Sequence, residues 1–181
     1  MHPRLAAVIA HVDSARAELL TAVDAIPEPL REARPSEEAW SVAEILEHLT
    51  RVEKGVAKLV ALKVGEMQMH AAPPKEGDDI APVNFDRFAV LADRANRIEA
   101  PERVVPLGEM SAESACAALQ ETRGLLLDQL HAADGLALSS VRHPHPFLGE
   151  LDLYEWVQFI GEHERRHVAQ IRELAVHFAA S

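Results

Sequence analysis

Hydrophobic side chains recur every three or four residues in four segments of this chain, which is the period of an amphipathic helix. The first stripe runs from Leu5 to Ile26 and stops before Pro27, which ends a helix because it has no backbone N–H to donate. The second begins at Ser41 and has a plausible stop at Gly65. The predicted helices cover residues 5–26, 41–65, 111–134 and 152–178.

Two of these helices begin with a capping-box pattern. Ser41 is followed three residues later by Glu44, and Asp152 is followed three residues later by Glu155. In this motif the first side chain accepts a hydrogen bond from the backbone three residues on, while the glutamate reaches back to the first backbone N–H. No segment has a convincing alternation of apolar and polar residues that would indicate a β-strand. The pattern therefore predicts an all-α four-helix bundle.

A long connection, residues 66–110, separates the second helix from the third. A stretch of this length in a compact domain is usually functional or partly helical. We predict a short helix in it from Asn84 to about Ile98, with Phe85, Phe88 and Leu91 packing inward. A crossover this long also allows two successive helices to run parallel.

Composition narrows the class of protein. The chain has 181 residues, 48% of them apolar and 26% charged, which fits one soluble domain spanning residues 1–181. Its net charge of −11 repels phosphate, so we expect no nucleic-acid partner and no anionic membrane partner. The single cysteine, Cys116, and the absence of a recognisable signal segment favour a cytoplasmic location.

The fourth helix carries the most informative feature of the sequence. On its apolar stripe, His163 and His167 follow Ile160 and precede Ile171. Residues four apart lie one turn from each other on the same side of a helix. Two imidazoles among core positions need partners for their nitrogens, and a divalent metal ion supplies them.

The same segment, His163-Glu164-Arg165-Arg166-His167, matches the HExxH motif of zinc proteases. In those enzymes the glutamate acts as a general base, so Glu164 is a candidate base or a residue that orients a metal ligand. The longer protease signature has Gly and His where this chain has Gln170 and Glu173, and the chain ends too soon to supply a downstream glutamate ligand. A protease is therefore disfavoured, and a solvated Glu164 paired with a nearby arginine is an equally good interpretation.

A third ligand has to come from another helix, and His48 in the second helix is the best candidate. From the residues alone, His48 is either a ligand or a hydrogen-bonded core residue. His143 and His145 fall in a predicted loop between prolines, where they would line the mouth of a pocket. Trp40 and Trp156 are expected to anchor the core near the site.

Two blocks of the chain resemble the DinB-like superfamily of four-helix-bundle metalloenzymes. The segment from Trp40 to Leu49 is similar to the family's Trp-Ser-x-x-Glu-x-x-x-His-Leu element. The second block runs from His145 through Trp156 to the closing segment His163–Ile171, in which two histidines four apart are followed by Gln-Ile. Both blocks occur in the family's order, and the resemblance covers most of the chain.

The resemblance implies a bundle with a long crossover between its second and third helices. It also implies one divalent metal ion, zinc or nickel, bound at the positions of His48, His163 and His167. Several relatives transfer a low-molecular-weight thiol to a small electrophile, so a thiol S-transferase is the leading hypothesis, with a small thiol and an electrophile as partners. Glu47 is a second candidate, beside Glu164, for orienting a ligand.

Two alternatives remain open. One is a hydrolase that uses a metal-bound hydroxide, and the other is a non-catalytic stress-response or binding module. A homodimer is one assembly that the sequence allows, and the oligomeric state stays open.

Overall fold

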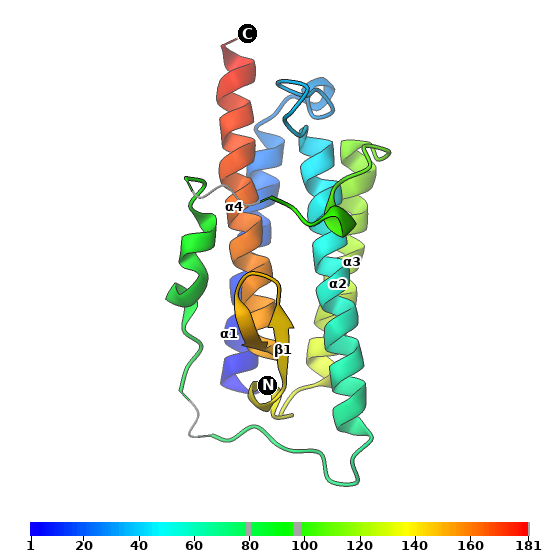
Figure 1. Ribbon diagram of the computed structural model, residues 1–181, viewed down its shortest axis with the longest axis vertical. Coiled ribbons are helices and arrows are strands. Elements are labelled where there is room, and N and C mark those ends of the chain that lie inside the picture. The colour runs from blue at the N-terminus through cyan, green and yellow to red at the C-terminus, as the bar shows by residue number, and fades with distance from the viewer. Residues whose placement is uncertain (79–80, 96–98, 181) are drawn as a thin grey trace.

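The computed structural model describes residues 1–78, 81–95 and 99–180, and within them four long α-helices form a bundle (Figure 1). They are α1 (Pro3–Asp24), α2 (Val42–Gln68), α3 (Ala112–Ala132) and α4 (Leu153–Ala179). Short 3-10 helices lie between them: η1 (Glu28–Leu30), η2 (Phe85–Ala92), η3 (Glu102–Val104) and η4 (Leu138–Ser140). The predicted four-helix bundle is confirmed.

The predicted capping boxes set the starts of α2 and α4. Ser41 accepts a hydrogen bond from the Glu44 backbone N–H, and Glu44 accepts one from the Ser41 N–H. Asp152 and Glu155 make the same reciprocal pair at α4. The predicted stop at Gly65 was wrong, because α2 continues through this glycine to Gln68.

The helices pack as two pairs, α1 with α4 and α2 with α3. In Figure 1, α1 and α4 run upward while α2 and α3 run downward, so α2 and α3 are parallel. This is the arrangement that the long crossover allows, since its ends lie at opposite ends of the bundle. The packing of α2 against α4 is less extensive than the packing within each pair.

The crossover packs along α4 before it returns to α2 (Figure 1). The predicted helix from Asn84 is shorter than expected. It is the 3-10 helix η2, capped by the Asn84 side chain and ending at Ala92, and residues 96–98 lie outside the described part of the chain. Phe88 is buried, and Phe85 and Leu91 pack against the core, as expected.

A short β-hairpin precedes α4, in a segment where the sequence showed no convincing β alternation. Strand β1 (Arg142–His145) pairs antiparallel with β2 (Gly149–Asp152). Gly149 closes the turn at φ +75°, a conformation that favours glycine. His143 and His145, expected in a loop, therefore lie on a strand.

A layer of charged residues divides the core. One apolar cluster includes Leu5, Val8 and Val12 of α1, and a second begins with Leu19 on the same helix. Between the two clusters each helix contributes one charged residue to a buried ion-pair network. We call this network the charge layer, and its members are Arg16, Glu53, Arg123 and Glu164. None of the helices within the described residues has the length and apolar character of a membrane span.

Candidate metal centre

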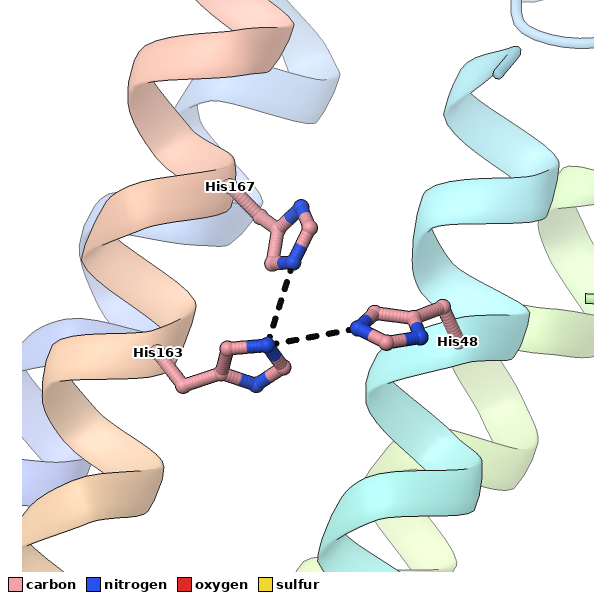
Figure 2. Close-up of side chains that lie close together, drawn as sticks. All are labelled: His48, His163 and His167. Carbon is pink, nitrogen blue, oxygen red and sulfur yellow. Dashed lines mark hydrogen bonds between the residues drawn. The ribbon is translucent and has the colours of Figure 1, made fainter. Parts of the chain in front are cut away.

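Three histidine side chains converge between α2 and α4 (Figure 2). His163 Nε2 lies 3.2 Å from His48 Nε2 and 3.2 Å from His167 Nε2. His163 and His167 project from successive turns of α4, and His48 reaches them from α2. The structure thus brings together the three residues that the sequence singled out as ligands.

Hydrogen bonds at the far ring nitrogens orient two of these rings. His48 Nδ1 lies 2.7 Å from the Val104 carbonyl oxygen, and His167 Nδ1 lies 2.9 Å from Gln170 Oε1. A carbonyl oxygen only accepts, so each Nδ1 carries the proton and donates it. Each Nε2 is then left with a lone pair that faces the centre of the cluster, as in histidines that bind metal ions.

This arrangement leaves too few N–H donors for the contacts between the three Nε2 atoms. With His48 and His167 protonated at Nδ1, only His163 Nε2–H is available to donate, and one N–H satisfies one of its two neighbours well. Imidazole nitrogens bound tetrahedrally to zinc at about 2.0–2.1 Å lie about 3.3 Å apart. The two Nε2 separations of 3.2 Å match that spacing, so the residues fit a divalent metal ion.

All three imidazoles are held in the neutral form that binds metal. His48 and His167 are buried, with 3% and 5% of their surface exposed. Burial, together with the neighbouring His48, lowers the pKa of His167 to about 3. Burial also lowers the pKa of His48, and burial with the two neighbouring imidazoles places that of His163 well below its ordinary value.

Aromatic rings surround the histidines. The Trp40 ring lies 4.9 Å from the His48 ring, and Phe159 stacks on His163 at 5.4 Å. His145 of β1 in turn contacts Phe159 at 4.5 Å. The hairpin and Trp40, in the segment before α2, therefore both approach the centre. None of the three histidines lines either of the two cavities described, one between α1 and α3 and one beside Glu44 and Gly108.

Glu164 has partners away from the histidines. Its Oε1 accepts hydrogen bonds from Arg16 and Arg123, which belong to α1 and α3. Glu47 instead accepts hydrogen bonds from the backbone of the crossover at Leu107 and Gly108. A catalytic role for Glu164 stays a prediction, and its described contacts are those of the charge layer.

Residues 11–171 match the sequence pattern of the DinB superfamily. The chain belongs to this superfamily. This DinB protein is 28% identical over 169 residues to the uncharacterized protein YuaE of Bacillus subtilis (strain 168), which covers 90% of this chain and 93% of YuaE. It also resembles TT2238, described as a four-helix bundle protein, with a TM-score of 0.58 and 20% identity over 93% of this chain and 98% of the other. That likeness supports the four-helix-bundle fold.

Sequence reasoning missed the two carbonyl oxygens that orient the ligands. Gln170 is three residues beyond His167, a spacing at which helical side chains meet, so this partner had a signal in the sequence. Val104 contributes a backbone oxygen from η3, and a backbone acceptor cannot be predicted from the residue type.

Proposed function

We propose that this DinB protein binds one divalent metal ion through His48, His163 and His167 and is a metal-dependent enzyme. The observation that carries the proposal is the convergence of three Nε2 atoms from two helices, with the far nitrogens of His48 and His167 bonded to carbonyl oxygens. Three protein ligands leave coordination positions for a substrate, which is the mark of a catalytic site rather than a structural one.

The reaction we propose is transfer of a low-molecular-weight thiol to a small electrophile. When bound, the metal ion lowers the pKa of a coordinated thiol, so that a thiolate is present at neutral pH. In this transfer the sulfur forms a bond to the electrophilic carbon, the thiol proton passes to solvent, and the leaving group departs with its bonding electrons. Val104 and Gln170 keep the His48 and His167 rings in place throughout.

The partners of Glu164 support thiol transfer over protease-like hydrolysis. A zinc protease needs the glutamate of HExxH as a base beside the metal. Here that carboxylate is 1% exposed and is bonded to Arg16 and Arg123, so it is poorly placed to take a proton from water. A thiolate nucleophile needs no such base. We propose zinc or nickel as the metal, because three imidazoles suit both, and the cytoplasm as the location.

The first experiment measures the metal content. Protein prepared without a histidine tag, stripped with a chelator and incubated with zinc or nickel, is expected to retain one ion per chain by elemental analysis. His163→Ala should lose the ion, while His177→Ala, near the end of the same helix, should keep it. A wild-type protein that stays metal-free after both incubations would contradict the proposal.

The second experiment tests the reaction. The loaded and stripped proteins are incubated with small thiols and a chloro-dinitro-arene, and release of chloride and formation of the thioether are followed. We expect the loaded protein to transfer the thiol faster than either of two controls. One control is the stripped protein, and the other is loaded His177→Ala mixed with excess chelator. Equal rates in all samples would rule out transferase activity on this class of electrophile.

A further inference from the structure

The Glu47 carboxylate, next to His48 on α2, holds the crossover through hydrogen bonds to its backbone. Glu47 Oε1 accepts a hydrogen bond from the Leu107 backbone N–H at 3.0 Å, and Oε2 accepts one from the Gly108 N–H at 3.0 Å. Arg51, one turn further along α2, donates to Oε1 at 3.2 Å. The side chain is only 4% exposed, so these bonds are made in a water-poor environment and hold the segment strongly.

Gly108 is suited to these hydrogen bonds. Its φ is +73°, a conformation that side chains other than glycine's rarely adopt, and a Cβ there would lie 3.3 Å from Glu44 Oε1. The glycine lets two successive N–H groups turn toward the two oxygens of one carboxylate.

The same stretch of the crossover orients His48. Val104, three residues before Leu107, supplies the carbonyl oxygen that lies 2.7 Å from His48 Nδ1. Glu47 and His48 are neighbours on α2, and they therefore hold the crossover at two nearby points. The backbone between those points is short, so the position of the Val104 carbonyl depends on the bonds at residues 107 and 108.

We propose that Glu47 is a positioning residue for the metal centre. By fixing the crossover, its carboxylate keeps the Val104 carbonyl against His48 Nδ1, and this bond keeps the proton on Nδ1 and the Nε2 lone pair toward His163. The relevance to metal binding rests on the proposed function, whereas the effect on the His48 tautomer is a property of the metal-free protein.

Glu47→Gln is the main test. A glutamine has one carbonyl oxygen, so its amide cannot accept from both backbone N–H groups, and its NH₂ faces one of them. Glu76→Gln is the matched control. Glu76 is also a buried carboxylate that accepts from a backbone N–H and a hydroxyl, both of Ser139, but it makes these bonds at η4, away from the histidines.

The decisive readout is the tautomer of His48 in the stripped protein, measured by long-range 1H–15N NMR and assigned by the signals lost in His48→Gln. We expect Nδ1–H alone in wild type and in Glu76→Gln, and a mixture with Nε2–H in Glu47→Gln. Zinc affinity, measured by competition with a chromophoric chelator, should fall about tenfold or more in Glu47→Gln and stay at the wild-type value in Glu76→Gln. General loosening of the fold would lower stability without selecting one ring.

Gly108→Ala tests the same two hydrogen bonds from the backbone side and should shift the His48 tautomer in the same direction. This second variant keeps the proposal testable if Glu47→Gln does not fold. Wild-type tautomer populations in both folded variants would overturn the proposal while leaving the metal site itself intact. Conversely, a shifted tautomer in a protein that binds no zinc would support the positioning role of Glu47 and contradict the proposed function.

Discussion

Arg16 and Glu164 form a buried ion pair in which Arg16 Nη2 lies 2.6 Å from Glu164 Oε1 and Arg16 Nε lies 2.9 Å from the same oxygen. Glu164 is the residue after His163, yet the two side chains serve different parts of the protein. His163 faces α2 and the other histidines (Figure 2), whereas Glu164 faces α1 and α3 in the charge layer. The layer joins the α1/α4 pair to the α2/α3 pair at a level close to the metal centre, and we expect it to set how α4 lies against α2.

The charge layer makes a prediction about stability. Replacing Arg123 by Met leaves Glu53 and Glu164 facing each other with only Arg16 between them. Removing one partner from a buried ion network costs about 3–5 kcal/mol, because a charge is left uncompensated. We expect a loss of that size in the free energy of unfolding, measured by urea denaturation. Arg142→Met is the control, since its pair with Glu155 is exposed and exposed pairs contribute about 1 kcal/mol or less.

A second variant separates the contribution of the charge layer to stability from its contribution to the register of α4 against α2. Replacing all four members of the charge layer by apolar residues of similar size is expected to leave stability unchanged or to raise it. If the layer sets the register of α4 against α2, the same variant should bind zinc more weakly. A variant that is stable and binds zinc like wild type would contradict the register role.

Gly161 allows α1 to pack closely against α4. A Cβ at this position would lie 2.5 Å from His11 Cδ2, so Gly161→Ala must displace the His11 ring from its contacts with Glu162 and Phe85. We expect a loss of about 1–3 kcal/mol in the free energy of unfolding. The matched control is Gly55→Ala in α2, where nothing lies within 4 Å of the added atom and removal of a mid-helix glycine should stabilise by about 0.4–1 kcal/mol.

A double substitution tests the cause. Once His11 is also replaced by Ala, adding Ala at 161 should cost less than it does in wild type. An equal cost in both backgrounds would mean that the ring of His11 is not the obstacle.

The parts of the fold that sequence predicted are those set by local spacing. The stripes and the two capping boxes placed the helix starts, since each box depends on residues three apart. The hairpin was missed because each strand has four residues and β1 contains Pro144, so no alternation stands out. Its stability comes from pairing and from the burial of Leu151 against the bundle, which the local sequence does not reveal.

The same distinction applies to the metal centre. His163 and His167 could be paired from their spacing alone, whereas the approach of His48 depends on how α2 packs against α4 and was reached through the family resemblance. The partners of Glu164 come from two other helices, α1 and α3, and those of Glu47 in the crossover are backbone atoms about sixty residues away. Neither set has a signature in the neighbouring residues.

We expect His145 to make the stability of the protein depend on pH. Burial lowers its pKa to about 4, with a further contribution from the nearby Arg103. Between pH 6.5 and 4 the unfolded chain binds a proton at this residue that the folded protein does not, so stability is lost as the pH falls through this range. Replacing His145 by Gln should flatten the fall in the urea midpoint between pH 7 and 4.5. Because the three clustered histidines are present in both proteins, an unchanged slope would show that His145 is not a source of the dependence.

Metal removal should destabilise the protein to an extent set by the free metal concentration. A ligand that binds only the folded state stabilises it by about 2.7 kcal/mol at a concentration one hundred times its dissociation constant. The three histidines come from two helices that are far apart in the sequence, so unfolding separates them and the unfolded chain offers no preformed site. We therefore expect the midpoint of thermal unfolding to rise with zinc concentration in wild type and to stay constant in His167→Ala. Without zinc, the two proteins should differ only by the packing of one ring. If zinc raises the midpoint of both equally, the ion binds elsewhere, and the three-histidine centre is not the site that stabilises the fold.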